Sequence, residues 1–318
     1  MNTLHLIIPP PGRQDHFLKA AAEAAPSLIK LLNRGESATP ETSLAGTLCK
    51  AFGIKQQQDC PLAPICAMTD GMNAASGYWL RLDPVHLEVV MGGLLLRPPA
   101  SLQLSQSEAS ALIADINLHW QREGLVIQAA SPTRWYLHLP ESPNLHTSPL
   151  DQMVGEYLTA GLPRGADARH YLKLINEVQM LMHSHPVNVA RETAGNLAVN
   201  GLWLWGGGTL PTCKTQLDLA AGDVFEIEAL SQRAGCSFIA PPNAISDMKL
   251  SNHALVALPS IEVSGHREIS AYLAQLEQNW FQPLLHQLAW GRIKRARLDL
   301  LGQKTVKLTP SQTWRFWR

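Results

Sequence analysis

The chain has 318 residues, 46% of them hydrophobic, and its 26 basic side chains balance its 26 acidic ones. This length can bury a sizeable core in one or two domains. The zero net charge argues against general nucleic-acid binding, which needs a basic surface. It is also compatible with self-association into a homo-oligomer. The five scattered cysteines favour reduced thiols in a cytoplasmic protein. We expect no signal peptide, because the N-terminus has no basic region and only a very short apolar run. We expect no membrane span, because no apolar run approaches about 20 residues.

Hydrophobic periodicity, interrupted by Gly and Pro, predicts alternating strands and helices along the chain. Strands are predicted at residues 4–8, 78–82, 86–91, 94–97, 125–129, 134–139, 201–205, 236–240 and 254–258. Helices are predicted at residues 17–32, 42–52, 62–68, 105–120, 150–157, 168–183, 225–233 and 269–285. The last segments, 292–300, 305–308 and 313–317, alternate in polarity and predict an antiparallel C-terminal meander.

This order of elements predicts an α/β fold with a mixed sheet flanked by helices and with antiparallel hairpins. We expect residues 1–318 to form a single domain, with a lobe boundary in the Pro-rich loop 140–149. Asp83-Pro84 is predicted to separate two strands, and Gly92-Gly93 to form a two-residue hairpin turn. Ser105 and Glu108 have the spacing of a capping box at the start of a helix.

The segment 183–208 gathers polar side chains, an apolar run and three glycines in a short space. Arg191 can clamp a phosphate or carboxylate, and Asn188 and Asn200 can orient it. The backbone N–H groups of Gly206, Gly207 and Gly208, at the end of a predicted strand, can cradle a phosphate. The segment therefore predicts an anion-binding site, although neither standard nucleotide-binding motif is present. The alternative is a structural loop followed by a flexible turn.

Other polar groups are candidates for catalysis or metal binding. Asp83 can orient His86 for proton transfer, or it can simply accept N–H groups at a turn. His185 is a third catalytic candidate, and the catalytic assignment stays open. Glu262 and His266 are spaced four apart and could hold a cation, but two ligands do not close a metal site. We therefore expect no cofactor, with a divalent metal as the alternative.

The run His185-Pro-Val-Asn-Val-Ala-Arg191, with Gly195, Asn200 and the segment 203–208, resembles cofactor-independent phosphoglycerate mutases of the archaeal type. The resemblance implies an alkaline-phosphatase-like α/β fold, which in those enzymes carries two metal ions and a serine nucleophile. The front half, through residues 78–87, and the end, through 314–318, are similar to bacterial regulatory proteins of the RpfE type.

The chain departs from the mutase pattern where the metals should bind. The first strand of the mutases ends in a metal-binding Asp-Gly, whereas here Ile8 is followed by prolines. The run 39–43 only faintly echoes the nucleophile motif, and 262–266 keeps at most two ligands of a later metal motif. Two-metal phosphoryl transfer depends on both metals. We therefore expect a degenerate mutase that binds an anionic, phosphorylated metabolite and acts in regulation. The alternative is an active mutase or phosphatase, metal-dependent or metal-independent.

Overall fold

The computed structural model describes residues 2–9, 14–97, 99–248, 251–261 and 265–313. The chain divides into two compact units, Met1–Gly53 with Cys213–Arg318 (unit 1) and Ile54–Thr212 (unit 2). The loop 140–149 lies within unit 2, and the expectation of a single domain stays a prediction. None of the helices in the described ranges combines the length and the apolar composition needed to cross a membrane.

Unit 1 is built on a seven-stranded mixed sheet with the order β2-β12-β11-β1-β10-β8-β9. Its strands are β1 (Thr3–Ile8), β2 (Glu36–Ala38), β8 (Leu219–Ala221), β9 (Ser237–Ile239), β10 (His253–Ala257), β11 (Arg295–Leu300) and β12 (Lys304–Leu308). The five strands from β11 to β9 are parallel, and β12 and β2 are antiparallel additions at one edge. This confirms the predicted mixed sheet flanked by helices.

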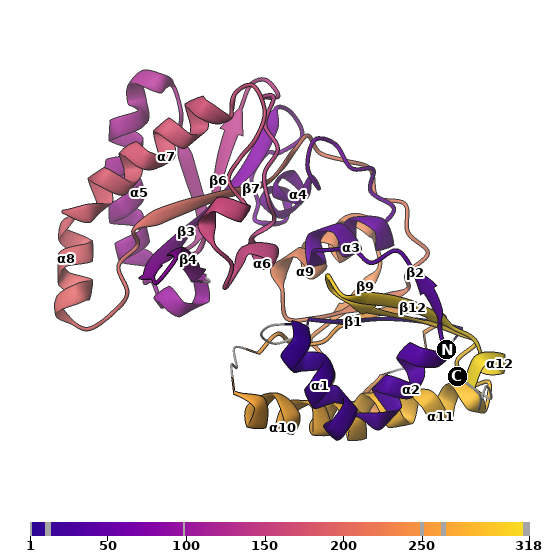
Figure 1. Cartoon of the computed structure of the whole chain (residues 1–318). Coiled ribbons are helices and arrows are strands. Elements are labelled where there is room, and N and C mark those ends of the chain that lie inside the picture. Colours follow the sequence, from indigo (N-terminus) through magenta and orange to yellow (C-terminus); the bar gives the residue numbers. More distant parts are fainter. Residues whose placement is uncertain (1, 10–13, 98, 249–250, 262–264, 314–318) are drawn as a thin grey trace. The chain divides into compact units, whose positions relative to one another are not determined.

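Helices cover both faces of the unit 1 sheet (Figure 1). One face carries α1 (Gln14–Ala24), α2 (Pro26–Arg34), α10 (His266–Leu276), the π-helical turn η5 (Glu277–Phe281) and α11 (Gln282–Ala289). The other face carries α3 (Leu44–Ala51) and α9 (Phe225–Ala234), while η4 (Ile245–Asp247) and α12 (Pro310–Thr313) are short turns. The single helix predicted at 17–32 is two helices, because Pro26 cannot donate in a helix interior and begins a new one.

The C-terminal meander is present in part. β11 and β12 form the predicted antiparallel hairpin, and β2 pairs with the far edge of β12. The third predicted strand, 313–317, is wrong at Thr313, which ends α12, and its remaining residues lie outside the described ranges.

Unit 2 contains an antiparallel sheet centred on the long strand β3 (Tyr78–Val90). Its other strands are β4 (Gly93–Arg97), β5 (Ile127–Ser131), β6 (Arg134–Leu139) and β7 (Gly201–Gly208). The sequence predicted a break at Asp83-Pro84, and this is wrong. One edge of β3 pairs with β6 at residues 78–81 and with β4 at 86–90. Pro84 falls between these two partners, so its missing N–H costs no ladder hydrogen bond.

The helices of unit 2 hold the sheet from two sides. α5 (Gln106–Trp120) and α7 (Ala168–His183) pack on one face through a shared apolar core (Figure 1). α4 (Leu62–Thr69) packs against β3 and β7. Shorter elements are α6 (Leu150–Met153), α8 (Pro186–Thr193), η1 (Pro99–Leu102), η2 (Gln121–Glu123) and η3 (Leu158–Ala160). The capping box of α5 is confirmed, with Ser105 Oγ accepting from the Glu108 N–H at 3.3 Å.

Candidate functional site

The mutase-like segment begins with a helix that the sequence analysis missed. α8 starts at Pro186, and His185 is its N-cap: the imidazole Nδ1 accepts a hydrogen bond from the Val187 N–H at 3.1 Å. The other ring nitrogen, Nε2, lies 3.0 Å from a carboxylate oxygen of Asp115. Both nitrogens of His185 are therefore engaged within the fold, and the side chain is buried.

Asn188 is also buried, and its amide joins two backbone segments. Its Nδ2 donates to the carbonyls of Met182 and Val199, both at 2.8 Å. Its Oδ1 accepts from the Val199 N–H at 2.9 Å. The side chain thus links the end of α7 to the segment that leads into β7.

Arg191 is 3% exposed, and its guanidinium is surrounded by acceptors of the protein itself. It donates to Glu108 at 2.8 Å, to the Leu197 carbonyl at 2.8 Å and to the Leu102 carbonyl. Burial alone would raise the pKa of Glu108, but hydrogen bonds from Ser105 and Arg191 outweigh burial and lower it. An incoming anion would have to displace the Glu108 carboxylate, so these contacts match the structural alternative.

The side chain of Asn200 makes the hydrogen bonds to β3 that a neighbouring strand would otherwise make. Its Oδ1 accepts from the Leu87 N–H at 2.6 Å, and its Nδ2 donates to the Leu87 carbonyl at 3.0 Å. β7 begins one residue later, where Gly201 pairs with Val85. The amide group of Asn200 therefore continues the pairing along β3 beyond the first residue of β7.

The three glycines lie inside β7 and are buried, whereas the sequence placed them in a turn after the strand. Gly206 has a φ of +70°, where the pairing of β7 with β3 shifts register. A Cβ on Gly207 would lie 2.4 Å from the Tyr78 hydroxyl, and one on Gly208 would lie 2.4 Å from Pro61. The glycines permit a bulge and close packing.

Asp83 and His86 are not brought together. Asp83 is fully buried and accepts two hydrogen bonds from Arg81, both at 2.9 Å, and one from Trp205 at 2.7 Å. Side chains alternate across a strand, so positions 83 and 86 point to opposite faces. The imidazole of His86 lies 2.8 Å from the Ala198 carbonyl. The predicted orienting role of Asp83 toward His86 has no counterpart in this geometry.

Of the two proposed cation ligands, Glu262 and His266, only His266 lies within the described ranges. His266 begins α10, is exposed, and has its Nε2 3.7 Å from a carboxylate oxygen of Glu23. Across the described ranges, no group of three or more His, Cys, Asp or Glu side chains is placed to hold a metal ion.

The carboxyl ends of the parallel strands in unit 1 meet at one edge of the sheet, where α/β proteins commonly hold ligands. β1 ends at Ile8, β10 runs through Ala257 to Leu258, and β8 ends at Ala221 followed by Gly222. All five residues are buried. The last residues of these central strands are therefore aliphatic, while Asp223 follows directly after Gly222.

The run 39–43, which faintly resembles the nucleophile motif of the mutases, follows β2 at the same edge of the sheet. Ala38 ends β2 and pairs with Thr305, which in turn pairs with Asp299 near the carboxyl end of β11. The chain then enters α3, whose N-cap is Ser43. The Ser43 hydroxyl is buried and accepts from the Gly46 N–H at 3.0 Å.

A buried ionic cluster on unit 1, centred on Asp299, was missed by the sequence analysis. Asp299 is 1% exposed and contacts the His5 imidazole, the Arg297 guanidinium at 2.8 Å and the Thr305 hydroxyl. Burial would raise the pKa of Asp299, but these partners outweigh burial and hold it well below its ordinary value. Polar residues at alternate positions of β1, β11 and β12 were the available signal.

The chain is an α/β protein of two units. Unit 1 has a mostly parallel sheet, and unit 2, which is inserted in the sequence of unit 1, has an antiparallel sheet. No family model matches it. It is 29% identical over 113 residues to the 2,3-bisphosphoglycerate-independent phosphoglycerate mutase of Methanosarcina mazei, covering 34% of this chain and 28% of that enzyme. It is 30% identical over 111 residues to the 2,3-bisphosphoglycerate-independent phosphoglycerate mutase 2 of Methanothermobacter thermautotrophicus, covering 34% of this chain and 28% of that enzyme. The chain is thus a distant homologue of these mutases, and the match spans under a third of their length.

Two solved structures also resemble the chain. The PH0037 protein of Pyrococcus horikoshii matches 93% of this chain and 81% of its own, with a TM-score of 0.50 and 13% identity. The cofactor-independent phosphoglycerate mutase of Thermoplasma acidophilum covers 97% of this chain and 90% of its own, with a TM-score of 0.43 and 14% identity. At such low identity, the first of these likenesses supports the α/β fold and nothing further.

Proposed function

We propose that this chain is a degenerate phosphoglycerate-mutase-like protein that binds an anionic, phosphorylated metabolite and acts through that binding. The sequence relation to the mutases supports the ligand class. The proposed loss of catalytic turnover is supported by the aliphatic residues at the ends of two central strands, Ile8 of β1 and Leu258 after β10. Two-metal phosphoryl transfer needs side chains that hold both metals beside the reacting oxygens. The aliphatic side chains of Ile8 and Leu258 cannot supply such ligands.

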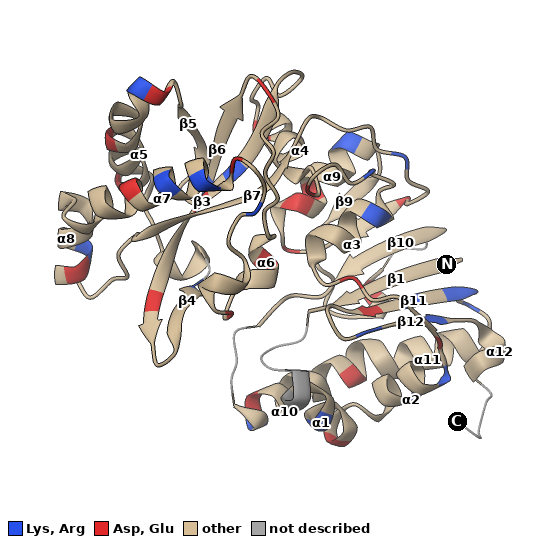
Figure 2. Cartoon of the chain, turned by 45° about the horizontal axis from the view of Figure 1, so that its top comes forward, with Lys and Arg blue, Asp and Glu red and all other residues tan. Residues whose placement is uncertain are grey.

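The regulatory role, the cytoplasmic location and self-association belong to the same proposal. The regulatory role rests on the resemblance to RpfE-type proteins, and the location rests on the scattered cysteines. The neutral balance of charge supports a small anionic metabolite rather than nucleic acid as the partner. Figure 2 is in keeping with this balance, since Lys and Arg are interspersed with Asp and Glu on both units.

We place the metabolite at the carboxyl edge of the unit 1 sheet, in place of Asn188, Arg191, Asn200 and the three glycines. The reason is that the side chains of Asn188 and Arg191 are already bonded within unit 2. At the edge of unit 1, the half-buried Lys304 begins β12 opposite Leu300, the last residue of β11. An ammonium group at this position can pair with a phosphate.

Thermal unfolding with increasing 3-phosphoglycerate tests the binding, together with metal analysis and a screen of phosphate esters in Mg²⁺ or Mn²⁺. The metabolite should raise the unfolding temperature in a concentration-dependent way, without turnover. Lys304→Ala should abolish the shift. Lys307→Ala, which removes the same charge three residues further along β12, should leave it intact. Turnover of an ester with bound divalent metal would instead establish the alternative, an active mutase or phosphatase.

A further inference from the structure

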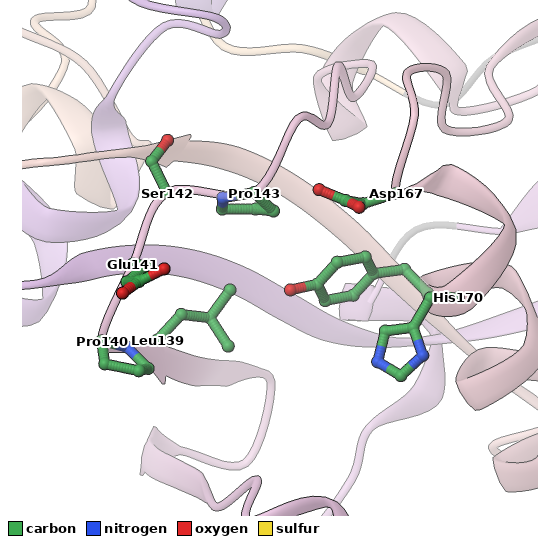
Figure 3. A pocket seen from close by; sticks show the side chains of 8 residues that line it. Leu139, Pro140, Glu141, Ser142, Pro143, Asp167 and His170 are labelled. Carbon is green, nitrogen blue, oxygen red and sulfur yellow. The ribbon is translucent and has the colours of Figure 1, made fainter.

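Unit 2 has a hollow of about 320 Å³ that takes no part in the proposed function. It lies where β6 ends and α7 begins, and Figure 3 shows the side chains that line it. They are Leu139, Pro140, Glu141, Ser142, Pro143, Asp167, His170 and Tyr171. This volume is at the lower end for small-molecule sites, so it suits a small ligand or a single side chain.

Two carboxylates give the hollow its charge. Glu141 and Asp167 stand at opposite sides of it in Figure 3, and both residues are exposed. One oxygen of Asp167 accepts from the Asn144 N–H at 2.7 Å, which fixes the carboxylate in place. Neither Lys nor Arg is among the eight lining residues. The hollow therefore favours a cationic group over an anionic one.

The Tyr171 hydroxyl is a second, independent sign of a ligand. The side chain lines the hollow and is 8% exposed, yet its hydroxyl makes no hydrogen bond among the described residues. Burial, followed by the charge of Asp167, raises the pKa of Tyr171 to about 12. The hydroxyl thus stays neutral at physiological pH. The Tyr171 hydroxyl is not one of the fully buried polar atoms without a partner, so its oxygen is accessible within the hollow and can accept a hydrogen bond from a ligand.

Three of the remaining lining residues, Leu139, Pro140 and Pro143, are apolar, and Ser142 and His170 are polar. Leu139 and Pro143 are buried, and Pro140 lies beside them. The His170 ring meets the Tyr171 ring edge-on, with centroids 5.3 Å apart. Such walls suit a chain of methylene groups. An ammonium at the end of that chain has three donors, enough for two carboxylates and the phenol oxygen.

We infer that this hollow binds an alkylammonium group, either of a free diamine or of a lysine side chain in a peptide. Both ligands present the same chemistry, an ammonium group on an aliphatic stem. This site lies in unit 2 and is independent of the metabolite proposed for unit 1.

Calorimetric titration of the full chain at low ionic strength tests the site. One arm uses 1,5-diaminopentane, and the other uses Nα-acetyl-lysine methylamide. We expect saturable binding in at least one arm. Glu141→Gln should raise Kd about tenfold, because it removes a charged partner of the ammonium. Tyr171→Phe should raise Kd about fivefold by removing a neutral acceptor, with circular dichroism to check folding.

The matched control is Glu156→Gln, which neutralises an exposed carboxylate of unit 2 outside the hollow. This variant should bind like the unmodified chain. Tighter binding of the diamine would identify a free amine as the ligand, and tighter binding of the lysine derivative would identify a peptide. The inference is overturned by the absence of saturable binding in both arms. Equal weakening by Glu141→Gln and Glu156→Gln would also overturn it, because that result indicates general attraction to an acidic surface.

Discussion

At the scale of single residues, the polar side chains of the segment 183–200 connect neighbouring elements through hydrogen bonds. His185 links the start of α8 to Asp115 of α5, and Arg191 links α8 to Glu108 near the start of α5. A charge that is buried must be paired, because its desolvation is costly. The same residue types that recognise a phosphate therefore also suit the interior of a fold, and composition alone does not separate the two roles.

Arg191→Ala should lower the free energy of unfolding by about 2 to 3 kcal/mol, because it leaves Glu108 and two carbonyls without their donor. Urea denaturation measures this change. Arg122→Ala, which removes an exposed arginine on η2, should change stability by less than about 0.5 kcal/mol. If the two variants were equally stable, the Arg191 guanidinium would not stabilise the fold. That result would favour the predicted anion-binding role of Arg191 instead.

At the scale of elements, local sequence predicted what local physics determines. The apolar spacing of α7 and the capping box of α5 lie within single segments, and both were predicted correctly. The roles of His185 and Arg191 depend on partners 70 and 83 residues away. No periodicity reports such distant pairs. The residues of the candidate site could thus be found in the sequence, but their partners could not.

β7 shows the same limit. An apolar run followed by glycines is the usual sign of a strand end, yet the strand continues through Gly208. Its last residues lie beside β3, and Tyr78 and Pro61 leave no room for a Cβ on Gly207 or Gly208. Neighbouring elements therefore decide the length of β7.

Gly207→Ala should destabilise the protein by about 1 to 3 kcal/mol, since its Cβ overpacks against the Tyr78 hydroxyl. Introducing Tyr78→Phe into that variant should restore part of the loss. By itself, Tyr78→Phe should be nearly neutral or stabilising, because the buried Tyr78 hydroxyl has no hydrogen-bond partner among the described residues. Thermal unfolding of the three variants gives the comparison. A Gly207→Ala protein as stable as the unmodified chain would contradict this account of the glycines.

At the scale of the whole molecule, the two units hold buried carboxyl groups whose responses to acid differ in sign. In unit 1, the partners of Asp299 lower its pKa. In unit 2, burial raises the pKa of Asp59 despite hydrogen bonds from Thr147. A lowered pKa means that the ionised group stabilises the fold, and a raised pKa means the reverse. Acid should therefore weaken the fold around Asp299 but not around Asp59.

The stabilisation from Asp299 is fully present above the ordinary carboxyl pKa of about 4 and declines as pH falls toward the lowered folded value. Hydrogen exchange, corrected for its intrinsic pH dependence, should show β1, β11 and β12 losing protection between about pH 4 and pH 2. Asp299→Asn should lower stability at pH 6 by about 3 kcal/mol, because it leaves buried partners uncompensated. It should also flatten the acid response of these strands. If the variant kept the same steep decline, other carboxyl groups would account for the acid sensitivity of unit 1, and the Asp299 cluster would not be its cause.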